Sequence, residues 1–266
     1  MGAETKGAAM GILNQKTSLI NMDDMIEKFA SDRSCSVYAV GKYVVGGSIT
    51  ETLRYSLNTQ TGEEGSCQIL PLDDFSNHMN IRFKVGYHDH LLEIKEICHR
   101  ETDLFTTEVY IFFAREPTIT LYSYVTIYGK FEESKALSLF AQVVKLVSDC
   151  YDKGVILSPS AENLVFSDKE ETQLALIELE KGMRHDSYHD LSHNYFAIDL
   201  SLGRILYLML VGDYPKNITD LSANSLPDHV SYQTKYIFQN IICENEELCL
   251  SPNQILQCMS SEHMIE

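Results

Sequence analysis

The spacing of apolar residues changes near residue 114 of this 266-residue chain. Before that point, short runs rich in β-branched and aromatic residues alternate with turn-forming residues, a pattern typical of strands. Thr61 and Gly62 separate the second run from the third, as a hairpin turn would. The first half is therefore predicted to form a small antiparallel sheet with strands at residues 37–45, 48–57, 66–70, 94–97 and 109–113.

After residue 114 the apolar positions follow the period of an α-helix. From 132 to 151 they recur every three or four residues, which predicts an amphipathic helix. Residues 201–211 are apolar on almost every face, so this helix is expected to be surrounded by others. Two further helices are predicted at 231–243 and 252–259, and a pair of short strands at 164–166 and 173–177.

The composition is that of a globular protein with an acidic surface. Apolar residues make up 44% of the chain, and 21 Lys and Arg against 38 Asp and Glu give a net charge of −17. This charge repels phosphate backbones and anionic lipids, so no nucleic acid and no membrane partner is expected. The most apolar stretch, residues 198–211, is too short to span a bilayer and contains Arg204.

The cysteines and the N-terminus indicate a cytoplasmic and/or nuclear protein. The seven cysteines are scattered without a C-x-x-C pair, which favours reduced thiols. Residues 1–10 carry no apolar signal region, and residues 1–30 are expected to be an N-terminal extension or an expression scar. The glycosylation sequon at Asn217 is not expected to be used.

The order of elements, a sheet followed by a long helix, a strand pair and a buried helix, resembles that of a protein kinase. This resemblance implies an α+β, two-lobed, kinase-like fold, with the N-lobe at 31–114 and the mainly helical C-lobe at 115–266. Phosphoryl transfer needs a glycine-rich loop, a lysine paired with a glutamate, a catalytic aspartate, and an Asn and an Asp for the metal ions. Most of these parts are altered here.

Two motifs of the N-lobe have lost the groups that hold phosphate. Residues 44–51 occupy the place of the glycine-rich loop, where Gly47 remains but Val45 and Thr50 would crowd a phosphate. Gln68 stands in the place of the phosphate-binding lysine, and a neutral amide cannot offset phosphate charge. The following helix candidate, residues 75–84, contains no Glu, so both members of the active-site ion pair are missing.

The C-lobe motifs are degenerate as well. Residues 156–163 resemble the catalytic loop His-Arg-Asp-Leu-Lys-Pro-Glu-Asn, with Ser158 at the place of the aspartate and Ser160 at that of the lysine. A serine hydroxyl is too weak a base to replace that aspartate. Asn163 survives, either as a metal ligand or, as we favour, in a loop-capping role. Glu178, Leu179 and Glu180 occupy the place of Asp-Phe-Gly, and Glu178 is a carboxylate that could bind Mg²⁺.

Several segments resemble the Tribbles family of pseudokinases, which carry Ser-Leu-Glu in place of Asp-Phe-Gly. These segments are residues 109–113, 121–125, 166–176 with 179–180, 201–207 and 210–215. The chain departs from that family at Ser158 and Ser160, where its members usually keep Asp and Lys. Its activation segment is shortened to about twenty residues without Ala-Pro-Glu, and Cys249 replaces the arginine that pairs with that motif. Ile198 stands where the buried helix should carry an anchoring aspartate, with Asp199 one residue late.

The resemblance implies a catalytically inactive adapter that binds client proteins and uses no cofactor or metal. The expected partners are basic-leucine-zipper (bZIP) transcription factors, MAP kinase kinases and an E3 ubiquitin ligase, the last through a tail that is not in this chain. Two alternatives stay open. One is an atypical kinase that uses Glu178, Asn163 and a relocated lysine, and the other is a nucleotide-sensing switch. A zinc site at His185, His189 and His193 is less favoured than a solvated loop.

Overall fold

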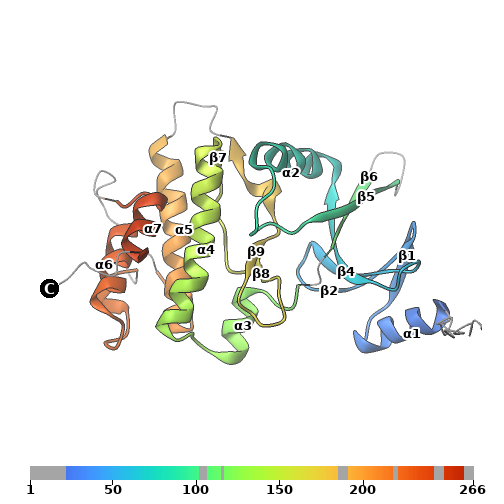
Figure 1. Cartoon of the computed structure of the whole chain (residues 1–266), viewed down its shortest axis with the longest axis horizontal. Helices are drawn as coiled ribbons and strands as arrows, with labels where there is room; N and C mark the ends of the chain where they lie inside the picture. Colours follow the sequence, from blue (N-terminus) through green and yellow to red (C-terminus); the bar gives the residue numbers. More distant parts are fainter. Residues whose placement is uncertain are drawn as a thin grey trace, which may run out of the picture.

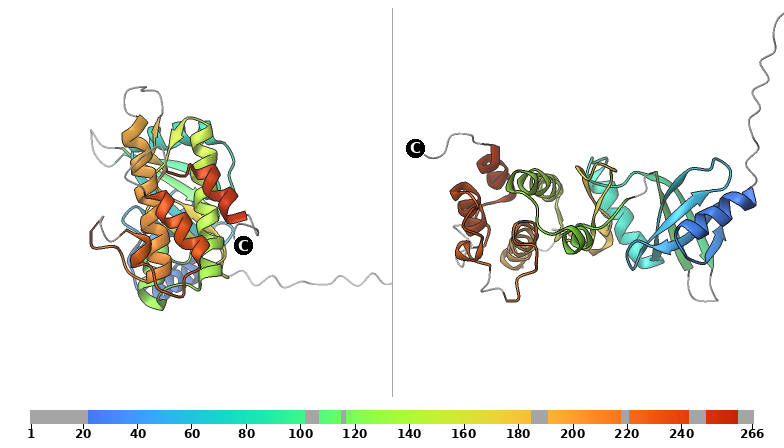
Figure 2. Two further views of the ribbon diagram at one scale, coloured as in Figure 1. Left: turned by 90° about the vertical axis from the view of Figure 1, so that its left-hand side faces the viewer. Right: turned by 90° about the horizontal axis from the view of Figure 1, so that it is seen from below.

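The computed structural model describes residues 22–101, 107–114, 117–184, 191–217, 221–242 and 249–260. Two lobes lie next to each other along the longest axis of the molecule, one built on a sheet and one made mainly of helices (Figures 1 and 2). This arrangement confirms the two-lobed α+β fold. None of the helices in the described part of the chain combines the length and apolarity needed to cross a bilayer.

The N-lobe contains one six-stranded antiparallel sheet with the order β1-β2-β3-β4-β6-β5. The run predicted at 37–45 is divided in two because Gly41 turns the chain with a φ of 59°. The predicted turn at Thr61 and Gly62 joins β3 to β4, with Gly62 at a φ of 73°. The strands are β1 (Val37–Val40), β2 (Tyr43–Ser48), β3 (Leu53–Asn58), β4 (Glu64–Pro71), β5 (Ile94–Glu101) and β6 (Thr107–Phe113).

Two helices pack on this sheet. Helix α1 (Met22–Asp32) buries Phe29, which is 1% exposed, against Val44 and Leu57. Helix α1 therefore packs on the sheet of the N-lobe. Helix α2 (Leu72–Val85) follows β4 without a linker and ends at Gly86, whose φ of 71° favours glycine.

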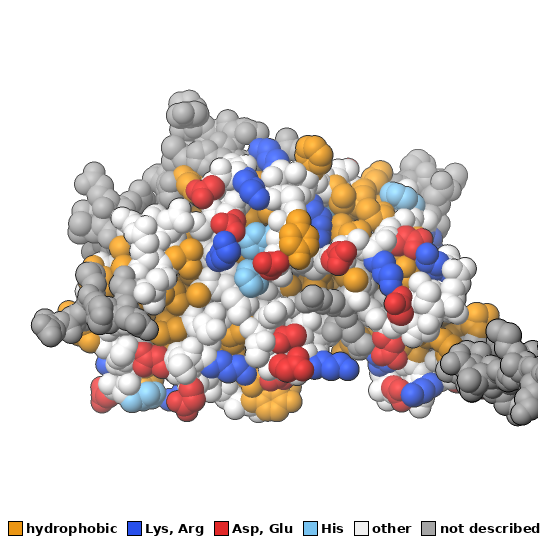
Figure 3. All heavy atoms as spheres, in the orientation of Figure 1, with side chains coloured by type: hydrophobic (Ala, Val, Ile, Leu, Met, Phe, Trp, Pro, Cys, Tyr) orange, Lys and Arg blue, Asp and Glu red, His pale blue; other side chains and the backbone are white. Residues whose placement is uncertain are grey.

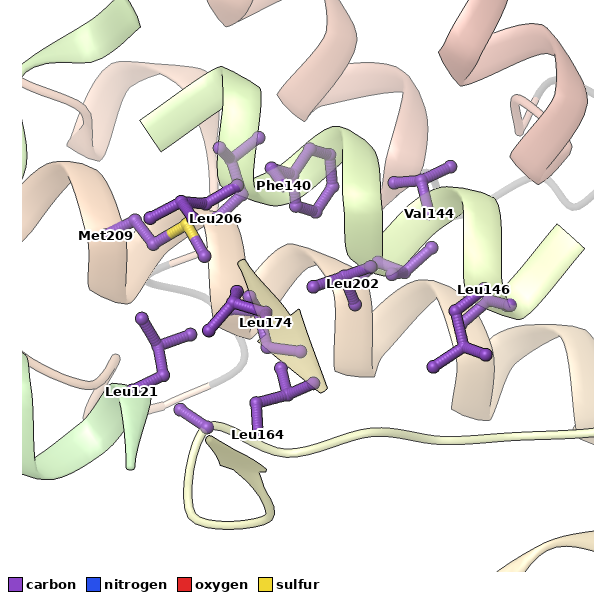
Figure 4. Close-up of a cluster of buried hydrophobic side chains, with 14 of the residues drawn as sticks. Leu121, Phe140, Val144, Leu146, Leu164, Leu174, Leu202, Leu206 and Met209 are labelled. Atoms are coloured by element: carbon purple, nitrogen blue, oxygen red, sulfur yellow. The ribbon is translucent and has the colours of Figure 1, made fainter. Parts of the chain in front are cut away.

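The C-lobe is organised around the helix pair α4 (Glu133–Asp152) and α5 (Leu191–Val211). Figure 4 shows Phe140 and Val144 of α4 in the same apolar cluster as Leu202, Leu206 and Met209 of α5. Burial of such side chains is the main source of the lobe's stability. The other helices are α3 (Leu121–Tyr128), α6 (Tyr232–Ile241), α7 (Pro252–Ser260) and the 3-10 turn η3 (Ala223–Ser225).

Four short strands line the junction between the lobes. Strands β8 (Leu164–Phe166) and β9 (Leu174–Leu176) form the predicted antiparallel pair, and β7 (Val155–Ile156) pairs with β10 (Met183–Arg184). The 3-10 helix η1 (Leu179–Lys181) lies between β9 and β10. Helix α5 starts ten residues before the predicted residue 201, so the segment that leads to it is even shorter than expected.

The cysteines correct one expectation. Cys249 is disulfide-bonded, so the chain does not carry seven reduced thiols. Five of the described cysteines are free thiols, namely Cys35, Cys67, Cys98, Cys150 and Cys258.

Candidate functional site

Gln68, at the place of a kinase lysine, is fully buried on β4 and contacts Glu180 of η1. Its side-chain amide nitrogen donates a hydrogen bond of 3.3 Å to Glu180 Oε2. The same oxygen lies 3.4 Å from Nδ1 of His78, which comes from α2. The Glu180 side chain is 6% exposed and His78 is 1% exposed, so β4, α2 and η1 meet at one buried carboxylate.

This carboxylate cluster also fixes helix α2 to the segment that follows β9. The side-chain amide of Asn77 donates to the carbonyl oxygens of Glu180 and Gly182. Leu179 is fully buried in the same core as Ile81 and Val85 of α2. Helix α2 is therefore held by polar and apolar contacts without the lysine–glutamate ion pair of a kinase.

Glu178, the candidate metal ligand, is already engaged by protein groups. Its Oε2 forms an ion pair of 2.5 Å with Lys181, and its Oε1 accepts a 3.4 Å hydrogen bond from the Thr52 hydroxyl. The hydrogen bond to Glu178 raises the pKa of Lys181, as expected for an ammonium group beside a carboxylate. Thr52 belongs to the β2–β3 turn, so this contact joins the two lobes at the place where a metal ion would be held.

The β2–β3 turn lies at the place of the glycine-rich loop, and two of its backbone amides form hydrogen bonds within the turn. The backbone N–H groups of Ile49 and Thr50 both donate to the Leu53 carbonyl, at 2.8 and 3.1 Å. Gly47 has a φ of 62° beside an irregularity in β2, and a Cβ there would lie 3.0 Å from the Tyr55 ring. The two bonded amides are directed into the turn, whereas a kinase loop directs its amides at phosphates.

The catalytic-loop segment between β7 and β8 carries two serine hydroxyls and an asparagine whose side-chain amide is hydrogen-bonded within the loop. Ser158 is exposed and Ser160 is partly buried. The side-chain oxygen of Asn163 accepts a 2.8 Å hydrogen bond from the Ser160 N–H, and its backbone carbonyl accepts a 3.1 Å bond from the Ile177 N–H. These contacts order the loop, and neither serine supplies the carboxylate that a general base requires.

A cluster of buried apolar side chains lies between the two lobes. Strands β3, β4 and β6 contribute Leu53, Leu70, Ile111 and Phe113, and the C-lobe contributes Val165, Ala175 and Ile177 to one buried cluster. Ile49, from the β2–β3 turn, packs on this cluster. The lobes are thus joined by a hydrophobic core.

A pocket of about 430 Å³ lies on the C-lobe beside the catalytic-loop segment between β7 and β8. Ser158 and Ser160 line it together with Arg204 of α5 and Tyr214. The Tyr214 hydroxyl donates a 2.9 Å hydrogen bond to Glu162, and its ring stacks on Tyr122 at 5.5 Å. Burial, then the neighbouring carboxylate of Glu162, raises the pKa of Tyr214. Arg204 is exposed and forms no ion pair with the residues that the structure describes.

The remaining candidates are less informative. His185 and His189 lie outside the described residues, and His193 belongs to α5. No group of three or more metal-ligating side chains occurs within the described ranges. Asp199, discussed above as a shifted anchor, is buried on α5 beside the buried Ile198.

The sequence reading missed His78 and Asn77 as members of the site. The spacing of His78 indicated that it is buried, because it lies three residues before Ile81 and seven before Val85, on the apolar face of α2. A histidine on a core-facing position needs a buried polar partner. No motif pointed to Glu180 as that partner, since the two residues are 102 positions apart.

Comparison with known proteins finds several Tribbles homologs among the similar sequences. No family model matches the sequence. Human "Tribbles homolog 1" is 26% identical over 238 residues, which cover 77% of this chain and 62% of the human protein. "Tribbles homolog 2" of Canis lupus familiaris is 26% identical over 254 residues, with coverage of 83% and 72%. The "SNF1-related protein kinase catalytic subunit alpha KIN12" of Arabidopsis thaliana is 24% identical over 259 residues, with coverage of 83% and 50%. The chain thus spans about 62% of the length of the human relative.

Proposed function

Since the chain is a divergent member of the Tribbles family of pseudokinases, we propose that it is a catalytically inactive adapter that binds other proteins. The observation that carries this proposal is the buried Glu180 carboxylate, which contacts Gln68 where a kinase would place a lysine on the nucleotide phosphates. In this role, the adapter regulates the abundance or activity of the client proteins that it binds.

Electrostatics support the absence of phosphoryl transfer. A nucleoside triphosphate needs positive charge around its phosphates. Its metal ion needs carboxylates that are free to coordinate it. Gln68 is neutral, and the Glu178 carboxylate is paired with Lys181. A carboxylate within a few ångströms of phosphate repels it, strongly so where water is excluded. An enzyme built on these residues would lose the charge stabilisation that contributes most to this reaction.

Clients of the proposed adapter are bZIP transcription factors and MAP kinase kinases, acting in the cytoplasm and/or nucleus. The pocket beside Ser158 and Ser160 supports docking on the C-lobe, because it combines apolar walls with the exposed guanidinium of Arg204, which has no ion-pair partner within the described ranges. An acidic, partly apolar client peptide complements that surface. Recruitment of an E3 ubiquitin ligase would use residues outside this sequence.

Client capture is tested by a pull-down from cells with tagged wild-type protein and two charge-reversal variants. Arg204→Glu should reduce recovery of bZIP and MAP kinase kinase clients at least fivefold, because it places a negative charge in the pocket. Lys169→Glu is the matched control, since Lys169 is exposed on the β8–β9 turn away from the pocket. Equal recovery with all three proteins would argue against docking at this pocket.

The two alternatives predict a different response to nucleotide. A melting temperature unchanged by millimolar ATP, with or without Mg²⁺ or Mn²⁺, supports the adapter. A metal-dependent increase supports a nucleotide-sensing switch, and transfer of radiolabelled phosphate would identify an atypical kinase.

A further inference from the structure

A second pocket, of about 450 Å³, lies where the loop between α2 and β5 meets α4 and the β8–β9 turn. Its apolar lining includes Leu91, Leu92 and Ala175, all of them buried. Gln142 of α4 donates to the Thr172 carbonyl at 2.8 Å and accepts from the Leu174 N–H at 2.9 Å. These bonds fix one wall of the pocket, so its shape is preformed.

Two carboxylates give this pocket a negative rim. Asp89 and Glu93 both line it and are exposed, and neither side chain forms a hydrogen bond or ion pair with another described residue. Figure 3 shows histidine side chains near the middle of the face that carries α4, with acidic and basic side chains around them. Asp89 and Glu93 thus leave the pocket with two negative charges that are available to a ligand.

Three of the basic groups near the pocket, His88, His90 and Lys145, do little to cancel this charge. Burial lowers the pKa of His90, which lines the pocket, so its ring is neutral at pH 7. Lys145 on α4 is paired with Asp149 at 2.9 Å, and His88 contacts the same carboxylate at 3.1 Å. The pocket therefore favours a cationic ligand.

Two exposed aromatic rings lie at the C-terminal end of α2, next to the pocket. Phe83 is 90% exposed and Tyr87 is 85% exposed, the two highest values among the exposed large apolar side chains of the described residues. Tyr87 also lines the pocket. Aromatic side chains left in water beside a polar pocket are typical of binding surfaces, because they supply large contact area at low entropic cost.

We propose that this pocket binds an arginine side chain presented by a peptide segment of a partner protein. A guanidinium group is planar, so it can stack on the Tyr87 ring while donating hydrogen bonds to carboxylates on the rim. The acidic chain, with a net charge of −17, attracts such a segment from a distance. The proposal rests on the adapter function only in taking a protein as the ligand.

The two carboxylates are not equivalent. Burial lowers the pKa of Arg82 to about 10, and the attraction of Glu93 opposes that shift. Arg82 is therefore still charged at pH 7 and offsets part of the Glu93 charge. The basic neighbour of Asp89 is His90, whose pKa is lowered by burial, so Asp89 is the stronger anchor for the arginine.

The test is an NMR titration of ¹⁵N-labelled protein with the pentapeptide Gly-Leu-Arg-Leu-Gly. We expect amide shifts in residues 87–93 and 172–175, and a dissociation constant at least fivefold higher for Asp89→Asn/Glu93→Gln, since each removes one ion pair. Asp89→Asn alone should weaken binding more than Glu93→Gln alone. The matched control is Asp73→Asn/Asp74→Asn, which removes two exposed carboxylates at the other end of α2.

Further arms separate the pocket from general charge attraction. The same peptide with citrulline in place of arginine should not bind. The proposal is overturned if wild type shows no localised shifts, if the citrulline peptide binds equally, or if the control variant loses as much affinity. None of these outcomes affects the client pull-down or the nucleotide assay, so the two proposals fail separately.

Discussion

Gln68 and Glu180 are joined by a hydrogen bond although they are 112 positions apart in the sequence. The Glu180 oxygen that accepts from Gln68 also lies 3.4 Å from His78. One carboxylate thereby links the sheet, helix α2 and the segment after β9. A buried carboxylate is tolerated only when hydrogen bonds replace its lost water, so removal of any member of this cluster should be costly.

Glu180→Ala should lower the free energy of unfolding by about 1–3 kcal/mol, because it leaves the Gln68 amide and a His78 ring nitrogen buried without partners. Urea unfolding followed by circular dichroism measures the change. Glu170→Ala, at an exposed position of the β8–β9 turn, is the control and should stay within about 0.5 kcal/mol of wild type. Equal effects of the two substitutions would show that the cluster does not stabilise the fold.

The core between the lobes should respond to truncation. Ile111 is fully buried in it, so Ile111→Ala should cost about 2–5 kcal/mol through lost burial and a cavity. The same substitution at Ile127, which is 64% exposed on α3, should have little effect. Thermal unfolding compares the two variants. A small loss for Ile111→Ala would mean that the lobes are not joined by a packed core.

Glu133 should make the C-lobe sensitive to acid. Its carboxylate accepts hydrogen bonds from the backbone and hydroxyl of Ser231 and from the Thr234 hydroxyl at the start of α6. Burial opposes ionisation, but these bonds outweigh it and lower the pKa of Glu133. Its folded pKa is thus below the unfolded value of about 4.3. The stabilisation is therefore present above that value and is lost as pH falls through the folded pKa.

The matching measurement is the free energy of unfolding of wild type and Glu133→Gln between pH 7 and pH 3. The variant should be about 1–2 kcal/mol less stable at pH 7, because the bonds to a charged acceptor are lost. The gap between the two proteins should narrow toward pH 3. A gap that is constant across this range would contradict the assignment.

The buried thiols should be chemically inert in the folded protein. Cys67 and Cys150 are fully buried, and burial raises the pKa of Cys150 to about 12 and that of Cys67 further. A thiol reacts as the thiolate, so both should resist iodoacetamide at pH 8. Mass spectrometry of native and urea-unfolded samples tests this, with labelling expected only after unfolding. Rapid labelling in the native state would contradict their burial.

The sequence predicted the parts of this structure that depend on local pattern. The helix period predicted α4, α6 and α7 to within about two residues, and two short runs on either side of a polar turn predicted the strand pair β8 and β9. The early start of α5 was missed because its first turns are polar and carry His193. Helix α1 was missed because only Phe29 of that segment is deeply buried, in a contact with strands that the local pattern does not reveal.

The candidate site shows the same division. Motif positions located Gln68, Ser158 and Glu180 without knowledge of which side chains touch. The Gln68–Glu180 bond and the Thr52–Glu178 contact join residues more than a hundred positions apart. Such pairs are set by the packing of the two lobes, and no local spacing predicts them.

The central claim is that the nucleotide cleft holds protein side chains in place of nucleotide and metal. Isothermal titration calorimetry of the purified chain with ATP and Mg²⁺ tests this claim most directly. The account predicts no saturable heat up to millimolar ATP, and the same result for Glu178→Ala and Asn163→Ala. A one-to-one isotherm that requires Mg²⁺ and disappears in both variants would contradict it.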